Sequence, residues 1–571
     1  MTQGRPWGAP DPTTTRASGA HGAVLDTARP APRARVRDEP VVVGTGPLSL
    51  GDVTDVARHQ SRVVVTEGVR RAVAAAHAVV LETLRSGSPA YGVNTGLGAA
   101  RDQLVPEELL LAFQEHVISS HAAAIGAPLD AEEVRALMFA RLAGMSRGGS
   151  GASPQLFEAL RRLLDARIHP VVPSQGSVGA ADLVQMAAVG AVLLGRGRVL
   201  LGATGAAGTR PAAEALAEAG LAPVQLQPKD ALALIGANSA SVGTGILAVR
   251  TIGHLVANAD VVAAGTVLAL GANTSVFADE LVRARPLPGQ IESAARIRAA
   301  LGRERPPAGG VRSVQDPVSL RTVPQVHGVA ADQLGHVAQM LLVELNSRPE
   351  NPLVLVDQRR VVSNGNFSLL GLGIGFEALR LALAHIGMLA ERRIALLART
   401  LRGHAPVEEH VRAGRWRSGY LVPVLLTNTA AAIASELKQM ASPLTVMGTP
   451  VGDGVEDHNS LAFGTIQLTV TAAGWVQTLL AIELLLAGDL ALTLPGRAGP
   501  PDDAHPAALL VAEAVAEGTA GRTTDAVVDR LRGLLITTCL SRPCLGDLVV
   551  GHDEDEAMSR VPDPQSALSA S

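Results

Sequence analysis

Three side chains, far apart along the chain, are of types that could move a proton and hold an acid group. Tyr91 lies on a glycine-flanked loop, where positive dipoles could lower the pKa of its hydroxyl and make it a general base, or the hydroxyl could cap a helix. Glu456 could serve as the base or form an ordinary ion pair. Arg321 offers a planar fork that suits a carboxylate, or it pairs with a nearby acid at a helix start. Together they indicate acid-base chemistry on a small acid.

Other polar residues add less to this chemistry. Gln315 and Asn351 carry amides that could hold a substrate carbonyl or satisfy loop backbone. His116 and His121 are five residues apart, not the four that align on one helix face, and no acid cluster completes a metal site. We therefore expect no metal. The chain has two cysteines, which we expect to be free thiols in a reducing cytoplasm, at Cys539 and Cys544.

The elements that must position these residues are predicted to be helices, so the fold class is mostly α. Credible strands are short and few, and we expect them in small hairpins beside the active-site loops: Val41–Val43, Arg198–Leu201 and Arg360–Val362. Apolar residues recur with a helical period in the following ranges: Glu67–Leu84, Glu107–His121, Ala131–Ala143, Pro154–Ala166, Asp182–Leu194, Asp230–Ala257, Pro324–Leu345, Phe367–Leu397, Val422–Met440 and Asn459–Ala487.

Composition divides the chain further. We expect disordered tails at 1–40 and 553–571, because the first is rich in Pro, Arg, Ala, Gly and Thr and the second is acidic and then rich in Ser, Ala and Pro. Between them we expect an N-terminal domain at 41–230, a long central helical bundle at 231–500, and capping helices at 501–552. The two capping helices are predicted at Ala504–Glu517 and Thr523–Leu535.

Charge and composition exclude some partners. A net charge of -4, a pI near 6.4 and 2% aromatic residues give no reason to bind nucleic acid or an anionic membrane. Two apolar stretches, Ala240–Phe277 and Leu461–Leu494, could be mistaken for membrane spans. Both carry charged interruptions that a lipid-facing helix avoids, such as Asp260 and Glu483. We expect them to be buried in the bundle.

Several motifs along the chain resemble those of the aromatic amino-acid ammonia-lyases, the family that acts on histidine, phenylalanine and tyrosine. The resemblance runs from about Leu48 to about Gly551 and includes a close match to the family's Tyr-Gly-Val-Asn-Thr-Gly-Phe-Gly loop. The motifs, in family order, are Tyr91-Gly92-Val93-Asn94-Thr95-Gly96-Leu97-Gly98, Ser120-His121-Ala122-Ala123, His169-Pro170-Val171-Val172-Pro173, Gln315-Asp316-Pro317-Val318-Ser319-Leu320-Arg321, Pro324-Gln325-Val326-His327-Gly328, Asn351-Pro352-Leu353, Gly365-Asn366-Phe367 and Glu456-Asp457-His458.

The resemblance implies roles for the candidate residues. The tyrosine that matches Tyr91 removes the β-proton in relatives, and the arginine that matches Arg321 binds the substrate carboxylate. His121 stands where histidine and tyrosine lyases select the side chain, which implies a polar or imidazole-like substrate group, although a core histidine bonded to a backbone carbonyl fits equally. Glu456 matches an acid that contacts the ring in histidine lyases. Relatives are helical homotetramers of the fumarase/ammonia-lyase type, with active sites built from three subunits, so we expect a tetramer.

One motif departs from the family where the chemistry depends on it. Relatives read Gly-Ser-Val-Gly-Ala-Ser-Gly-Asp-Leu and cyclise Ala-Ser-Gly into the electrophile methylidene-imidazolone (MIO). This chain reads Gly176-Ser177-Val178-Gly179-Ala180-Ala181-Asp182-Leu183, which is one residue shorter and lacks the Ser-Gly pair. Neither Ala180 nor Ala181 has a β-leaving group, and cyclisation of Ser177 through Val178 would crowd the ring. We therefore expect no MIO and no other cofactor.

Further departures fall on groups that support the MIO in relatives. Gly236 replaces an asparagine that hydrogen-bonds it, and Val318 replaces a second catalytic tyrosine. Ser368 and Ala143 replace a histidine and an asparagine. The residues that match substrate-facing groups in relatives remain. The losses therefore fall on the groups that form or support the MIO.

Three functions fit this pattern. The favoured one is a repurposed lyase or isomerase that acts on a small carboxylate-bearing metabolite by elimination, addition or isomerisation without MIO. Because no electrophile activates an amine, the substrate must supply its own acidity or a better leaving group. The alternatives are a non-catalytic ligand-binding or scaffold protein, and an amino-acid ammonia-lyase with an unusual electrophile.

Overall fold

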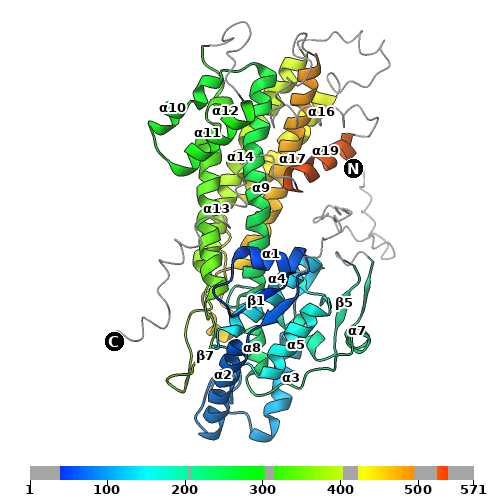
Figure 1. Ribbon diagram of the computed structural model, residues 1–571, viewed down its shortest axis with the longest axis vertical. Coiled ribbons are helices and arrows are strands. Elements are labelled where there is room, and N and C mark those ends of the chain that lie inside the picture. Colours follow the sequence, from blue (N-terminus) through cyan, green and yellow to red (C-terminus); the bar gives the residue numbers. More distant parts are fainter. Residues whose placement is uncertain (1–38, 203–206, 303–313, 403–421, 494–523, 538–571) are drawn as a thin grey trace, which may run out of the picture.

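The computed structural model describes residues 39–202, 207–302, 314–402, 422–493 and 524–537. Long helices form a bundle in the upper half of Figure 1, and shorter helices, loops and small strand pairs form the lower half. The prediction of a mostly α fold with a long central bundle is confirmed. The predicted tails, the predicted helix Ala504–Glu517, and Cys539 and Cys544 lie outside the described residues.

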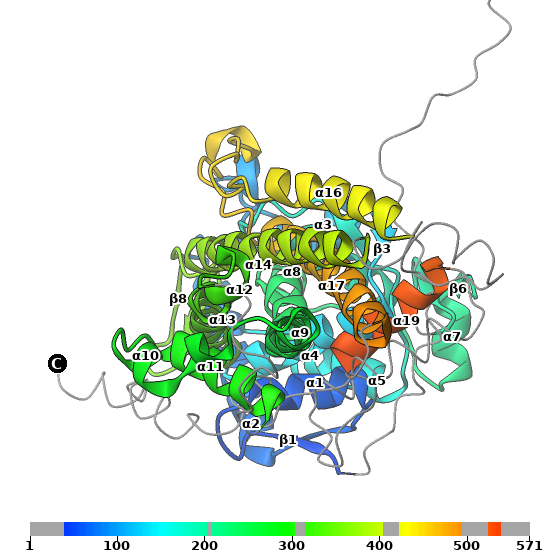
Figure 2. The same cartoon turned by 90° about the horizontal axis from the view of Figure 1, so that it is seen from above.

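Four long helices form the bundle: α9 (Ser239–Leu270), α13 (Val323–Asn346), α14 (Leu370–Arg402) and α17 (Ala462–Thr493). Seen from above, α9 lies in the middle and α16 (Val422–Met440) lies on the outer side of α14 (Figure 2). The bundle is flanked by α11 (Pro288–Leu301), which packs on α9 and α13, and by α19 (Thr524–Thr537), which packs on α17 and α9. The predicted capping helix Thr523–Leu535 corresponds to α19.

Charged residues inside the bundle have partners there. Asp260 accepts hydrogen bonds from Arg296 and Ser293 and contacts His327 at 2.8 Å. Glu483 accepts from Arg393 at 2.6 and 2.9 Å and from a threonine of α9. Such pairing compensates the desolvation of a buried charge.

Three helical stretches among the described residues have the length and apolar composition needed to cross a membrane: Asp230–Leu270, Leu370–Leu401 and Ala462–Ala491. Within the protein, 100%, 61% and 78% of their most apolar windows are buried. A helix that is apolar nearly all round needs such a cover, and here neighbouring helices supply it.

The lower region contains short helices with clear start signals. Ser49 and Asp52 form a capping box at α1 (Leu50–Arg58), and Asp130 and Glu133 form one at α4 (Ala131–Ser146). Ser153 caps α5 (Pro154–Asp165), where proline takes the first helical position. The other helices of this region are α2 (Glu67–Arg85), α3 (Leu110–His121), α6 (Leu183–Leu193), α7 (Ala212–Glu218) and α8 (Asp230–Ile235).

The strands form four separate pairs. β5 (Arg198–Leu200) pairs with β6 (Thr209–Pro211), and β7 (Leu353–Leu355) pairs with β8 (Arg360–Val362), both antiparallel. β3 (Ile125–Pro128) pairs with β4 (Pro173–Gln175). The hairpin expected at β1 (Val41–Val43) is wrong, because β1 pairs in parallel with β2 (Val63–Val65) and α1 lies between them in the chain.

The single helix predicted over Asp230–Ala257 is also wrong. It divides into α8 and α9, which are separated by Gly236, Ala237 and Asn238. The Ala237 carbonyl accepts a hydrogen bond from the Asp182 amide instead of continuing the helix. The break therefore joins the start of α9 to the loop that lacks the Ser-Gly pair.

Candidate active site

Tyr91 is held on a tight loop whose own side chains fix its shape. Asn94 accepts from the Ala90 amide at 2.7 Å and donates to the Ser88 carbonyl at 3.0 Å. Gly92 has a φ of +63°, and a Cβ there would lie 2.3 Å from a Leu232 methyl carbon, so only glycine fits. The Tyr91 hydroxyl accepts a hydrogen bond from the Gly98 amide at 3.3 Å. The loop thus places a half-buried hydroxyl at the start of η1 (Gly98–Ala100).

Glu456 lies on a turn that is joined to two other segments of the site. The turn closes through a pairing of Val451 with Glu456 around η4 (Gly452–Gly454), and η4 packs against η1. Just beyond it, the Ser460 hydroxyl donates to the Gly179 carbonyl at 2.8 Å, and the Leu461 amide donates to the Val178 carbonyl at 3.0 Å. Glu456 is therefore anchored both to the tyrosine loop and to the shortened loop.

The acid and the tyrosine influence each other's ionisation. Burial raises the pKa of Tyr91 above its usual 10.0, the nearby Glu456 raises this pKa further, and the Gly98 amide and Arg101 oppose the rise. Burial raises the pKa of Glu456 above 4.5, and a positive charge on His121 lowers it. The packing of η1 against η4 places the Tyr91 loop beside the Glu456 turn, and the influence of His121 on the pKa of Glu456 indicates that His121 is near this turn. At neutral pH the tyrosine carries its proton.

His121, the last residue of α3, has a defined orientation. Its Nδ1 lies 2.8 Å from the Val117 carbonyl oxygen. A carbonyl can only accept, so Nδ1 carries the proton and Nε2 is an acceptor while the ring is neutral. The backbone contact expected of a core histidine is therefore present. The ring is nevertheless only half-buried, and Nε2 remains able to accept a proton from a substrate group.

The loop from Gly176 to Asp182 is held together by a buried carboxylate. Asp182 is fully buried and accepts from the Ser177 hydroxyl at 2.8 Å, the Ser241 amide at 2.7 Å and the Ser241 hydroxyl at 3.1 Å. Burial raises the pKa of Asp182, and these hydrogen bonds oppose the rise. Ala181 has a φ of +65°, a left-handed conformation that alanine adopts only at a cost. Ala180 pairs with Ser368.

The residues of this loop do not fit an MIO. Ala180 and Ala181 have methyl side chains, so neither supplies a hydroxyl that could leave as water. Ser177 is the loop's hydroxyl residue, and its oxygen already donates to Asp182 and accepts from the Gly179 amide at 3.2 Å. Through these two hydrogen bonds, Ser177 stabilises the conformation of the loop.

Two residues near the site were missed from the sequence. Arg101 lies close enough to Tyr91 to lower the pKa of that tyrosine, and its side chain is 47% exposed. Asn238 begins α9, donates to the Phe367 carbonyl at 2.9 Å, and has a buried Oδ1 without a partner among the described residues. The signal for Asn238 was available, because it is an asparagine two positions after Gly236, which replaces the family asparagine.

Arg321 and Gln315 lie away from this cluster. Arg321 ends α12 (Val318–Arg321), which is at the upper end of the bundle beside α10 (Asp279–Arg283) and α11, while α3 and α8 are at the lower end (Figure 1). Arg321 Nε donates to the Asp316 carbonyl at 3.2 Å, and Asp316 accepts from the Asn273 amide. One chain therefore does not place the arginine fork beside Tyr91.

Asn351 satisfies loop backbone, one of its two expected roles. Its Oδ1 accepts from the Asn364 amide at 3.0 Å. The adjacent strand β7 packs through Val354 into a small cluster that contains Val93 of the tyrosine loop. Asn351 thus supports the neighbourhood of Tyr91. Among the described residues no group of three or more His, Cys, Asp or Glu could hold a metal ion.

The fold and the site define a mostly α protein in which a long helical bundle has a tyrosine, a histidine and a carboxylate near one of its ends. A sequence model described as aromatic amino acid lyase matches residues 48–509. The chain belongs to the aromatic amino acid lyase family. It is 37% identical over 448 residues to a histidine ammonia-lyase of Anaeromyxobacter dehalogenans, a match that covers 77% of this chain and 87% of that protein.

Solved structures share the fold. Histidine ammonia-lyase from Trypanosoma cruzi superposes with a TM-score of 0.75 at 26% identity, covering 91% of this chain and 96% of that chain. Tyrosine aminomutase from Streptomyces globisporus superposes with a TM-score of 0.77 at 27% identity, covering 91% and 99%. The fold expectation of the ammonia-lyase type is confirmed by these likenesses.

Proposed function

We propose that this member of the family is an enzyme that works without MIO, as a lyase or isomerase on a small carboxylate-bearing metabolite. The observation that carries the proposal is the grouping of Tyr91, His121 and Glu456 beside a loop whose Ala180 and Ala181 have no hydroxyl. The side chains that can transfer a proton are present, whereas the Ser-Gly pair that would form the MIO is absent. The similarity to both an ammonia-lyase and an aminomutase supports elimination or isomerisation as the reaction class.

The ionisation of the two candidate bases favours Glu456 as the base. Burial raises the pKa of Glu456 toward neutral pH, which strengthens it as a base while it still ionises. The pKa of Tyr91 is raised away from neutral pH, so its hydroxyl is better suited to donate a proton. In an elimination, Glu456 takes a proton from carbon, those bonding electrons form the double bond, and the leaving group departs with the proton of Tyr91. Gly98 and Arg101 then stabilise the phenolate.

His121 contributes selectivity in this scheme. Its neutral Nε2 accepts a hydrogen bond from a polar group of the substrate, because Nδ1 is already committed to the Val117 carbonyl. The substrate must bring its own activation, either an acidic C–H or a leaving group better than an amine, because nothing in the loop supplies an electrophile. This requirement separates the proposed substrate class from ordinary amino acids.

The carboxylate clamp requires a second copy. Arg321 ends α12, at the end of the bundle opposite to α8, whose Leu232 contacts the Tyr91 loop, so Arg321 could bind a carboxylate beside Tyr91 only from another subunit. A homotetramer of the kind that the resemblance implies would bring the two ends together. Gln315 would arrive with Arg321 on the same segment.

The test is a substrate search with matched variants. Purified protein is incubated with a panel of amino acids, acrylates and keto acids, and products are detected by mass spectrometry. For any substrate found, Glu456→Gln is expected to lower kcat by roughly 10²- to 10⁴-fold, and Tyr91→Phe is expected to lower it in the same range. Glu214→Gln, at an exposed glutamate of α7, is the control and should retain activity.

The alternatives have their own signatures. A ligand that raises the thermal stability of the protein without turnover over long incubation would favour the non-catalytic binding protein. An intact mass lower than the sequence mass by two waters would favour an unusual electrophile. Full activity in both Glu456→Gln and Tyr91→Phe would contradict the proposed acid-base pair.

A further inference from the structure

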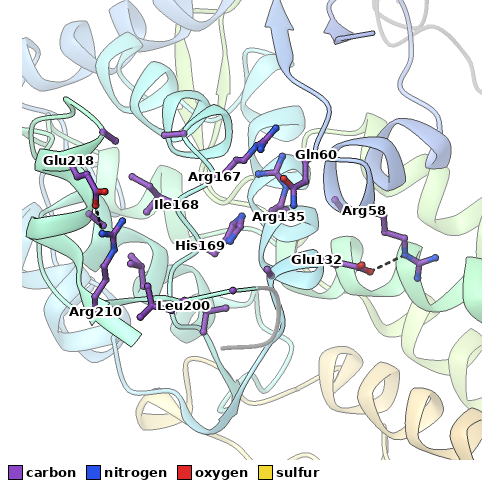
Figure 3. A pocket seen from close by; sticks show the side chains of 18 residues that line it. Arg58, Gln60, Glu132, Arg135, Arg167, Ile168, His169, Leu200, Arg210 and Glu218 are labelled. Carbon is purple, nitrogen blue, oxygen red and sulfur yellow. Dashed lines mark hydrogen bonds and ion pairs between the residues drawn. The ribbon is translucent and has the colours of Figure 1, made fainter. Parts of the chain in front are cut away.

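A cavity of about 660 Å³ lies among elements of the lower region in Figure 1, and Figure 3 shows the side chains that line it. Its walls come from α1, α4, the end of α5, β5, β6 and α7, and none of Tyr91, His121 and Glu456 lines it. A volume of this size accommodates a small metabolite. The cavity has no role in the proposed reaction.

The cavity is lined by more positive than negative charge. Four arginines and two glutamates line it. Two of the arginines are neutralised at its edges, where Arg58 pairs with Glu132 at 3.2 Å and Arg210 pairs with Glu218. Arg135 and Arg167 form no ion pair with a carboxylate among the described residues. Two guanidinium groups without a carboxylate partner therefore line the cavity, of which Arg135 is buried and Arg167 is exposed.

These two arginines are grouped with a histidine between the edge pairs (Figure 3). Arg135 is only 2% exposed and donates to the carbonyls of Val56 and Leu164 at 2.8 and 2.9 Å, which fixes its guanidinium. The Nε2 of His169 is buried and has no partner among the described residues. Arg167 is exposed, whereas Arg135 and the His169 Nε2 are buried, and an anion held between them would give the buried nitrogen an acceptor or donor partner and the buried cation a counter-charge.

The ionisation of the group agrees with this geometry. Burial and the neighbouring Arg135 and Arg167 lower the pKa of His169 to about 4, and burial and Arg167 lower the pKa of Arg135 to about 10. Asp165, the acid that opposes the lowering of the Arg135 pKa, is already bonded to Arg161 and to the Val63 amide. Like charges are thus held together without a counter-ion of their own.

We propose that this cavity binds a dianionic phosphate group at Arg135, Arg167 and His169. The charge of such a group equals that of the two unpaired guanidinium groups, whereas a single carboxylate would neutralise only one of them. Its oxygens can accept from both arginine forks and from the Nε2–H form of His169. The phosphate can be free or part of an organic ester, and the cavity volume has room for the ester.

A bound anion would also act on the segment that leads to the active-site loop. The His169 carbonyl accepts from the Leu200 amide at 2.8 Å, and the Val171 amide donates to the Arg198 carbonyl at 2.9 Å, so β5 holds this segment in place. β4 and the loop from Gly176 to Asp182 follow directly in the chain. A short segment that is hydrogen-bonded to β5 thus connects the proposed phosphate site at His169 to the loop from Gly176 to Asp182.

The test uses the full chain with inorganic phosphate and glycerol 3-phosphate as probes and sodium chloride at equal ionic strength as the reference. Both binding by calorimetry and the thermal unfolding midpoint are measured. We expect at least one phosphate probe to bind and to raise the midpoint above that in chloride. Tighter binding of the ester would assign an organic phosphate, and equal binding would assign the free anion. Binding of neither probe would overturn the proposal.

Variants at Arg167 test whether the phosphate probes bind in this cavity. Arg167 has a φ of +55°, a conformation that asparagine and aspartate tolerate better than most residues, so Arg167→Asn and Arg167→Asp remove or reverse the charge without adding backbone strain. Arg167→Asn should weaken binding at least about tenfold, and Arg167→Asp should weaken it further. Arg71→Gln, at an exposed arginine of α2 outside the cavity, is the charge-matched control. Equal affinity in Arg167→Asn and Arg71→Gln would also overturn the proposal.

Discussion

At the scale of single residues, the shortened loop combines a satisfied carboxylate with a strained alanine. Asp182 accepts hydrogen bonds from Ser177 and Ser241, and the preceding residue, Ala181, has a positive φ. Left-handed backbone costs a non-glycine residue about 1 kcal/mol or more. The loop therefore keeps a defined conformation at some cost in stability, which is typical of loops at functional sites.

This strain predicts opposite effects of glycine at adjacent positions. Ala181→Gly should raise the free energy of unfolding by up to about 1 kcal/mol, because glycine adopts φ +65° without the steric cost. Ala180→Gly should lower it by about 0.5–1 kcal/mol, because only the added freedom of the unfolded chain counts there. Denaturant unfolding of the two variants measures the difference. Equal destabilisation by both would show that Ala181 is not strained.

The pKa shifts at the site predict the pH dependence of turnover. As the base, Glu456 must be ionised, so activity should rise with pH through a pKa above 4.5. As the acid, Tyr91 must keep its proton, so activity should fall only above pH 10. The pH profile of kcat for any substrate found would therefore have a broad plateau. A single alkaline rise near pH 10, lost in Tyr91→Phe, would instead identify the tyrosinate as the base.

The sequence indicated which residue types belong to the site better than it indicated their partners. Tyr91 and Glu456 follow from motifs, and the structure brings them near His121. Arg101 was missed because an exposed arginine after a turn carries no signal until its neighbour is known. The loop contact of Asn351 could not be separated from a substrate contact, because an amide serves either equally well.

At the scale of the elements, the start of α4 contains a half-buried carboxylate, Glu133, whose pKa is raised well above the usual value for glutamate. Glu133 accepts from the Asp130 amide at 3.0 Å as part of the capping box. Burial, with a contribution from Asp130, raises the pKa of Glu133 to about 7. The capping box thus satisfies the backbone at the helix start, but ionisation of Glu133 destabilises the folded state.

This cost predicts a pH-dependent stability. Because the folded pKa is raised, the stabilising protonation of Glu133 is fully present below pH 4.5 and is lost as pH rises through about 7. Glu133→Gln, which keeps the accepting oxygen, should therefore gain up to about 3 kcal/mol over the native chain between pH 4.5 and pH 8. Urea unfolding at the two pH values measures this gain. Asp357→Asn, at an exposed turn, should show no such change.

Helices were easier to predict than their breaks. The long apolar periodicities of α13, α14, α16 and α17 were found within a few residues. The break between α8 and α9 was not found, because it depends on the Ala237 carbonyl bonding to Asp182, a contact that no local pattern contains. The parallel pairing of β1 with β2 was missed for a similar reason, since α1 makes the crossover between them.

At the scale of the whole molecule, α12, which ends at Arg321, and α8, whose Leu232 contacts the Tyr91 loop, lie at opposite ends of the bundle (Figure 1). If sites are shared between subunits, two inactive variants should rescue each other when they are co-expressed. Glu456→Gln and Arg321→Gln chains should together form mixed tetramers in which some sites have both native residues. We expect each variant alone to lose most activity and the mixture to regain a measurable fraction of it. No regain in mixed tetramers would show that the sites are not shared.

The helix α9 contacts both of these ends. At its start, the Ser241 amide donates to Asp182 at 2.7 Å, and just past its end the Asn273 amide donates to Asp316 at 2.7 Å, on the segment of Arg321. Its 32 residues span about 48 Å at 1.5 Å per residue. α9 thus sets the distance between the segment of Asp182 and the segment of Arg321. Copies that pair end to end have to match this length, so adding or deleting a single turn of α9 would misalign the proposed shared sites while leaving their residues unchanged.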